Sequence, residues 1–199
     1  MRRLAALLLA FGLTAGTLQA DPVYPWLYDV IGVSADDVLN LRAGPSSEAE
    51  VIGALAHDAT GIEVVGINDN GYWLQIALPE STAWAATGFL APQPHDPELA
   101  FTRILDCGGT EPFWGLQITQ GTGATLSRMD KADADLPAGR VRPSPSMKNQ
   151  YFLDLGERHA AMLTTKLCSD GMSDRAYGLS IRLVIDETET MHGCCSLRP

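Results

Sequence analysis

The sequence predicts an all-β protein of two domains, a small barrel followed by a second antiparallel β domain (barrel or sandwich) that disulfides stabilise. Three observations predict this architecture. Short apolar runs alternate with turn residues over residues 24–92, a proline-rich segment follows, and all four cysteines lie in the C-terminal half. No long stretch with the 3.6-residue period of an amphipathic helix competes with this interpretation.

The composition limits the possible partners. The chain has 199 residues with 24 acidic and 14 basic side chains, a formal net charge of -10, and 46% apolar residues, which is enough for a packed core. Only 19% of the residues are charged, so wholesale disorder is not expected. Phosphate backbones and anionic lipids attract clusters of Lys and Arg that this chain lacks, and we therefore expect no nucleic-acid partner.

The first twenty residues predict a secretory signal peptide at 1–20, cleaved after Ala20. A basic start, Arg2-Arg3, precedes a short apolar run from Leu4 to Leu13, and small or neutral residues close the segment. The alternative is an uncleaved anchor, although the apolar run is too short to span a bilayer comfortably. We therefore expect a periplasmic or secreted protein that does not span the membrane after cleavage.

The first domain is predicted at 24–92 and consists of short strands. Each apolar run has the length of a strand and β-branched or aromatic content, and turn residues recur about every ten residues. The runs are 38–41, 51–55, 62–67 and 72–76. The segment from Ala91 to Pro97 contains three prolines, so we expect that it cannot continue a sheet, and we place a linker at 93–98.

The second domain, predicted at 99–199, is also rich in β structure. Residues 177–185 alternate large apolar with small or polar side chains, the pattern of a strand with one buried face. Residues 161–168 fit either a strand or a short helix. Residues 131–149 contain prolines, aspartates and glycine, and we predict a long surface loop there.

The four cysteines are Cys107, Cys168, Cys194 and Cys195. An even number in an exported chain favours disulfides over a metal site. Adjacent cysteines on a strand point to opposite faces, so Cys194 and Cys195 each need a distant partner of their own. The alternative is a zinc site with His192, although the spacing lacks a Cys-x-x-Cys motif.

The first domain resembles bacterial SH3 (SH3b) domains. The matching pieces stand in the family's order: Leu39-Asn40-Leu41-Arg42-Ala43-Gly44-Pro45, Val51 to Leu55, Asn70-Gly71-Tyr72-Trp73-Leu74, and Ala83-Trp84-Ala85 to Leu90. Ala83 stands where the family usually has glycine. The resemblance implies an SH3-like barrel and a binding or targeting module, commonly associated with peptidoglycan or its peptide, and not a catalyst.

Four residues of this domain are candidates for ligand binding: Asn40, Arg42, Tyr72 and Trp84. Asn40 and Arg42 share the strand face opposite the leucines. The alternative role of Arg42 is to buttress the turn that follows the strand. For Trp84, as for Trp73, the alternative is a place in the core.

The second domain resembles a bacterial envelope domain of uncharacterised activity. The pieces that carry this resemblance are Gly109-Thr110-Glu111-Pro112-Phe113-Trp114, Cys168-Ser169-Asp170-Gly171-Met172-Ser173 and the terminal Gly193-Cys194. The resemblance implies that Cys168 pairs with Cys194, which leaves Cys107 for Cys195.

Polar and aromatic residues of these motifs predict a shallow ligand site formed by Glu111, Trp114, Asp170 and Arg175. The alternative is structural: Trp114 and Met172 fill the core, and Glu111 pairs with Arg175 to fix the two loops.

No catalytic residue, metal or cofactor is predicted. A cysteine peptidase needs a thiolate at a helix N-terminus and a nearby histidine, whereas Cys168 has acidic neighbours that would raise the pKa of its thiol. A serine hydrolase would need a Gly-x-Ser-x-Gly turn, which the chain lacks. We therefore expect a non-enzymatic envelope module that contacts peptidoglycan peptide or an envelope protein. The alternatives are a cell-wall hydrolase or an accessory factor of one, and a passive structural envelope protein.

Overall fold

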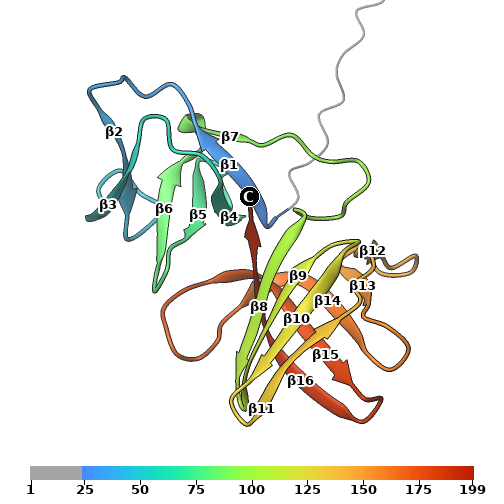
Figure 1. Cartoon of the computed structure of the whole chain (residues 1–199). Coiled ribbons are helices and arrows are strands. Elements are labelled where there is room, and N and C mark those ends of the chain that lie inside the picture. Colours follow the sequence, from blue (N-terminus) through green and yellow to red (C-terminus); the bar gives the residue numbers. More distant parts are fainter. Residues whose placement is uncertain (1–23) are drawn as a thin grey trace, which may run out of the picture.

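The computed structural model describes residues 24–199 and forms two antiparallel β sheets, as the all-β prediction requires (Figure 1). The predicted signal peptide, 1–20, lies outside the described residues. Within 24–199 the one helical element is the 3-10 turn η1 (Thr87–Phe89). No helix in this range has the length and apolar character needed to cross a membrane.

The N-terminal sheet has seven strands in the order β3-β2-β6-β5-β4-β1-β7. Their alternating side chains place one set inside and the other at the surface. The strands are β1 (Trp26–Val30), β2 (Val38–Arg42), β3 (Val51–Ala56), β4 (Ile62–Ile67), β5 (Trp73–Ala77), β6 (Thr82–Ala86) and β7 (Leu90–Pro92). Strand β2 meets β6 at a single pair, where Arg42 lies opposite Trp84.

The expectation that the proline-rich segment leaves the sheet from Ala91 onward is wrong for its first two residues. Ala91 and Pro92 belong to β7, and Pro92 lies opposite Tyr28 of β1. Strand β7 is one of the two edge strands of the sheet. An edge position tolerates proline because no neighbour requires its missing N–H on the outer side.

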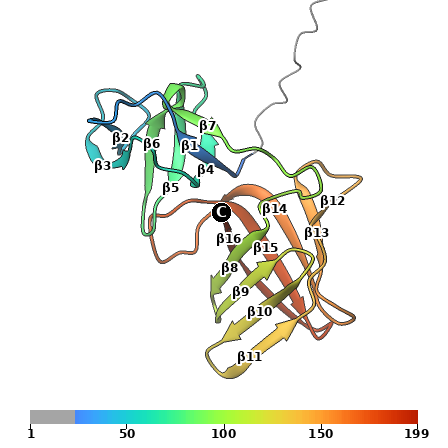
Figure 2. The same ribbon diagram turned by 45° about the horizontal axis from the view of Figure 1, so that its top comes forward.

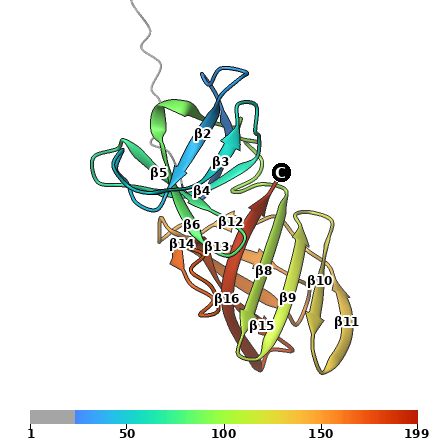
Figure 3. The same cartoon turned by 90° about the vertical axis from the view of Figure 1, so that its left-hand side faces the viewer.

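The C-terminal sheet has nine strands in the order β11-β10-β9-β8-β16-β15-β14-β13-β12. Consecutive strands are mostly joined as hairpins, and the long C-terminal strand pairs with the first one (Figures 1 and 3). The strands are β8 (Ile104–Thr110), β9 (Phe113–Thr119), β10 (Gly123–Arg128), β11 (Lys131–Leu136), β12 (Arg142–Pro143), β13 (Gln150–Asp154), β14 (Ala160–Cys168), β15 (Tyr177–Ile185) and β16 (Glu189–Arg198).

Three segments whose structure was predicted from the sequence lie in this sheet. Residues 177–185 form β15, as predicted, and the ambiguous segment 161–168 is a strand. The long surface loop predicted at 131–149 is wrong in part, because β11 and β12 lie within it. Strand β11 is an edge strand with mostly exposed side chains. Its sequence alternates polar residues with two alanines and Leu136, a period-2 pattern that the loop prediction overlooked.

Both disulfides lie in the second domain. Cys107 is bonded to Cys195, and Cys168 to Cys194. Each of the two adjacent cysteines thus has its own distant partner, as their positions on one strand predict. This pairing is the one that the envelope-domain resemblance implies.

One cluster of buried apolar side chains runs through both sheets, which meet at the C-terminal end of β16 (Figure 2). At this junction a Cβ on Gly178 would lie 2.5 Å from Pro25 Cβ, and a Cβ on Gly61 would lie 3.3 Å from Pro199 Cγ. The two domains are therefore in close van der Waals contact and pack directly against each other.

Candidate functional site

The barrel carries a shallow hollow of about 310 Å³ that we call the barrel groove. It lies between the loop before β2, the outer face of β2 and the start of β5. Its lining residues are Gly32, Val33, Ser34, Asp37, Val38, Leu39, Asn40, Arg42, Trp73, Ala86 and Phe89.

Strand β2 supplies the polar side of the barrel groove. Leu39 and Leu41 are buried, so Asn40 and Arg42 face outward on the same side, as the sequence predicts. The Arg42 guanidinium also donates from Nη1 to the carbonyl oxygen of Ala49 at 2.7 Å. Arg42 thus buttresses the turn and lines the groove at once.

Aromatic side chains supply the other side. Trp73 is half-buried and Phe89 is 42% exposed, and both line the groove. Of the other two aromatic candidates, Tyr72 is exposed and Trp84 half-buried, and neither lines it. The two tryptophans are not among the buried core residues, so the core role considered for them is not observed.

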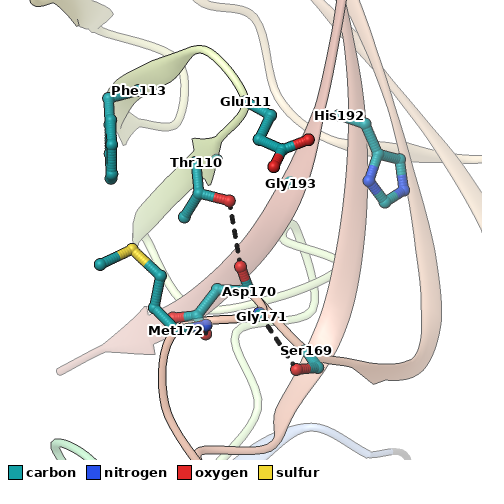
Figure 4. Close-up of a pocket in the computed structure, with 10 residues that line it drawn as sticks. Thr110, Glu111, Phe113, Ser169, Asp170, Gly171, Met172, His192 and Gly193 are labelled. Carbon is teal, nitrogen blue, oxygen red and sulfur yellow. Dashed lines mark hydrogen bonds between the residues drawn. The ribbon is translucent and has the colours of Figure 1, made fainter.

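The second domain contains a larger hollow of about 640 Å³ that we call the loop pocket. It lies between the β8–β9 turn, β16 and the segment after β14, which are the three motifs singled out in the sequence (Figure 4). Its lining residues are Gly109, Thr110, Glu111, Phe113, Ser169, Asp170, Gly171, Met172, His192 and Gly193.

Asp170 organises the segment that forms one wall of the loop pocket. Its carboxylate accepts hydrogen bonds from the N–H of Met172 at 3.0 Å and of Ser173 at 3.2 Å, and from the Tyr177 hydroxyl at 2.9 Å. These bonds, that from Met172 first, lower the pKa of Asp170 below its ordinary value of 3.8. The Thr110 hydroxyl donates to the Asp170 carbonyl oxygen at 3.1 Å, which joins the two walls.

The remaining side chains give the loop pocket an apolar and a polar side. Figure 4 shows Phe113 and Met172 on one side, with Glu111 and His192 on the other. Phe113 is 48% and Met172 67% exposed. The structural alternative for Met172, a place in the core, is therefore wrong, because its loop holds it at the surface.

Trp114 does not line the loop pocket. It is 6% exposed and follows Phe113 on β9, so it points to the opposite, inner face of the sheet. A Cβ on Gly109 or Gly193 would collide with the Trp114 indole, so these two glycines make room for the ring. The core role considered for Trp114 is the observed one.

Arg175 is also absent from the loop pocket, and its predicted structural partner was wrong. Its Nη2 lies 3.2 Å from Glu63 Oε2 on β4 of the barrel and 2.8 Å from the Ser196 hydroxyl, and Nη1 donates to Leu78 O at 2.9 Å. Arg175 thus joins the two domains, whereas Glu111 lies exposed at the loop pocket. The candidate set therefore divides between two neighbouring hollows: Glu111 and Asp170 line the loop pocket, whereas Trp114, Asp170 and Arg175 line an adjoining hollow of about 320 Å³.

Neither a free thiol nor a metal-binding cluster of side chains is found at these hollows among the described residues. Cys107 and Cys168 are both disulfide-bonded, so neither offers the free thiolate of a nucleophile or of a zinc ligand. In the part of the chain that the structure describes, no three His, Cys, Asp or Glu side chains are grouped to hold a metal ion.

A family model of the bacterial SH3 domain matches residues 37–91, which include the polar strand and both aromatic residues of the barrel groove. Comparison with curated proteins finds no match, and comparison with solved structures finds none either. The bacterial SH3 domain points to a cell-wall or peptidoglycan-binding module, and together with two disulfides it fits an extracytoplasmic protein. The match does not extend into the second domain, whose envelope-domain resemblance stays a prediction.

Sequence reasoning missed Phe89 and Glu63, and it considered His192 only as a zinc ligand and not as part of a ligand site. Phe89 follows the second tryptophan in the bacterial SH3 pieces, and its place beside a turn glycine could have marked it as a surface aromatic residue. His192 is adjacent to the terminal Gly-Cys motif that was singled out. Glu63 lies in an apolar run, and an acidic residue there needs a partner that sequence alone does not identify.

Proposed function

We propose that this chain is a non-enzymatic, periplasmic binding module whose barrel groove binds peptidoglycan peptide. The observation that carries the proposal is the groove itself, which brings Asn40 and Arg42 against Trp73 and Phe89 within the residues that match the bacterial SH3 domain. The fold alone would not select this function.

The chemistry of the groove suits a short peptide of the cell wall. Such a peptide carries amide, amine and carboxylate groups spaced by small apolar side chains. Asn40 offers an amide, Arg42 a guanidinium and Asp37 a carboxylate, while the two aromatic rings supply apolar surface. A small cleft with a few converging polar groups and aromatic walls is typical of ligand sites.

A non-enzymatic role is supported by the use of all four cysteine thiols in disulfides. The hydrolase alternative would need another nucleophile or acid–base pair. It predicts that muropeptides are cleaved by the purified chain. A passive structural protein, the third possibility, predicts no saturable ligand.

Co-sedimentation with purified peptidoglycan tests the proposal in the full chain. We expect Phe89→Ala to lower the pelleted fraction, because it removes one aromatic wall of the groove. The matched control is Phe113→Ala, which removes a similarly exposed ring from the loop pocket (42% against 48% exposed). Equal pelleting of Phe89→Ala and the unaltered chain would contradict the proposal, and a loss confined to Phe113→Ala would move the wall-binding site to the second domain.

A further inference from the structure

A row of five exposed side chains crosses the outer face of the C-terminal sheet, in a region that the barrel groove and the loop pocket leave unexplained. Cross-strand neighbours define the row, which we call the outer row: Arg142 lies opposite Phe152, Phe152 opposite Met162, Met162 opposite Arg182, and Arg182 opposite His192. All five side chains are exposed.

The side chains of the outer row all lie on the solvent face of the sheet, because the adjacent residues on each strand face inward. Leu153, Leu163 and both Ile181 and Leu183 are buried, whereas Phe152 is 39% and Met162 47% exposed. Two large apolar side chains therefore lie side by side in solvent at the centre of the row. Isolated exposed apolar residues are ordinary, but a contiguous patch between polar ends is typical of an interaction site.

Both ends of the outer row open into hollows. Arg142, Phe152 and Met162 line a hollow of about 340 Å³ together with the segment from Pro143 to Pro145. His192, at the other end, lines the loop pocket. Strands lie about 4.8 Å apart, so the row from Arg142 to His192 extends over about 19 Å.

The charges of the outer row fit an anionic partner. Arg142 and Arg182 form no salt bridge with any residue of 24–199, although acidic residues outnumber basic ones in this chain. The Arg142 guanidinium lies over the Phe152 ring, 5.6 Å from its centroid, which holds the cation in place. Two arginines thus flank two apolar side chains, and neither has a salt-bridge partner among the described residues.

We propose that the outer row binds an extended acidic peptide segment with an apolar residue between two acidic ones. Arg142 and Arg182 are three strand spacings apart, about 14 Å, and residues four apart in an extended peptide are separated by about 13 Å. Alternate side chains of such a peptide lie on one face, so the residue midway between the acids would meet Phe152 and Met162.

A narrow row favours a peptide over an anionic bilayer. Polar and acidic residues flank the apolar centre on the same face: Gln150 and Thr164 lie beside Phe152 and Met162 on one side. On the other side lie Asp154 and then the smaller, half-buried Ala160 and Val184. A bilayer would meet this whole face, including the exposed Asp154, and the net charge of the chain is -10. An extended peptide would contact the row alone.

The test uses the full chain and a fluorescein-labelled peptide, Gly-Glu-Ser-Leu-Ser-Glu-Gly, measured by fluorescence anisotropy. We expect saturable binding that Arg182→Gln weakens about tenfold and Met162→Ser also weakens, because each removes one contact. Arg103→Gln is the matched control: it removes the same charge from an exposed arginine that pairs with Asp96 away from the row. A peptide with lysine in place of both glutamates should not bind.

Several outcomes would overturn the proposal. These are no saturable binding of the peptide, binding that Arg182→Gln leaves unchanged, and equal weakening by Arg182→Gln and Arg103→Gln. Binding of phosphatidylglycerol vesicles in place of the peptide, lost in Arg182→Gln, would assign the row to a membrane surface. Self-association that Met162→Ser abolishes in sedimentation velocity, without peptide binding, would assign it to a second copy of the chain.

Discussion

Glu63 of the barrel and Arg175 of the second domain form a buried ion pair, with Glu63 Oε2 3.2 Å from Arg175 Nη2. The side chains are 7% and 16% exposed, and Glu63 Oε1 also accepts a hydrogen bond from the N–H of Leu197 at 2.8 Å. This pair fixes the orientation of the two sheets. Arg175 belongs to the segment between β14 and β15. The same segment contains Asp170, which lines the loop pocket.

Removal of Arg175 should therefore be costly. We expect Arg175→Met to lower the free energy of unfolding by about 3 kcal/mol, because it leaves the Glu63 carboxylate buried without its cation. In the double variant Glu63→Gln with Arg175→Met the same change should cost clearly less. Urea denaturation of the four proteins measures this coupling, and purely additive losses would show that the pair is not coupled.

Glu63 also predicts how stability depends on pH. Burial raises the pKa of Glu63 above its ordinary value of 4.5, despite the opposing bonds from Leu197 and Arg175. The native state then holds this proton at pH values where the unfolded chain has released it, so the contribution of Glu63 to stability falls as pH rises from 4.5 to the raised pKa. The stability difference between the unaltered chain and Glu63→Gln should shrink over this range, and a difference that grows with pH would contradict the prediction.

For Asp170 we expect a pH dependence of stability of the opposite sign. Its lowered pKa means that the stabilisation is present above the ordinary value of 3.8 and is lost as pH falls through the lower native value. We expect the stability advantage of the unaltered chain over Asp170→Asn to diminish on acidification. Chemical denaturation along an acid series checks this, and an advantage that grows on acidification would contradict the prediction.

The two disulfides should differ in their effect. In the chain-entropy model, the bridge across 88 residues contributes about 4.6 kcal/mol and that across 26 residues about 3.5 kcal/mol. Only the Cys168–Cys194 bridge borders the segment of Asp170. We therefore expect replacement of both its cysteines by serine to accelerate amide hydrogen exchange at residues 169–173, whereas loss of Cys107–Cys195 should spare these amides until global unfolding. The reverse pattern would contradict this assignment.

The glycines beneath Trp114 give a steric prediction. A Cβ on Gly193 would collide with the Gly108 carbonyl oxygen and the Trp114 ring, so Gly193→Ala should destabilise the second domain strongly. Gly115→Ala is the control, because its nearest neighbour, the Cys107 carbonyl oxygen, lies 4.0 Å from the added carbon. Thermal unfolding of both variants checks this, and equal melting temperatures would refute the steric argument.

The fold could be predicted from the sequence wherever local pattern decides it. Strands β2 to β5 and β15 carry apolar alternation or β-branched runs between turn residues, and the structure has strands there. Strand β11 was missed although its residues alternate polar and apolar side chains, because two of its three apolar positions are small alanines; pairing with β10 orders it. Pro92 was misjudged since a sequence does not show which strand lies at an edge.

The candidate site was predictable only in part for the same reason. Motif positions brought Glu111 and Asp170 to the loop pocket, and Trp114, Asp170 and Arg175 to the hollow beside it. The partner of Arg175 was not predictable, since Glu63 is 112 residues away in sequence and becomes its neighbour only when the two sheets pack. Adjacent residues of a strand point to opposite faces, so the sequence of β9 already predicts that Phe113 and Trp114 do not share a face.

The most direct test of the proposed function is a titration of the ¹⁵N-labelled full chain with soluble muropeptides, followed by amide chemical shifts. We expect saturable shifts that cluster at Asn40, Arg42, Trp73 and Phe89 in the barrel groove, with no cleavage of the muropeptides. An absence of saturable shifts, or shifts confined to the loop pocket at residues 109–113 and 169–172, would contradict it.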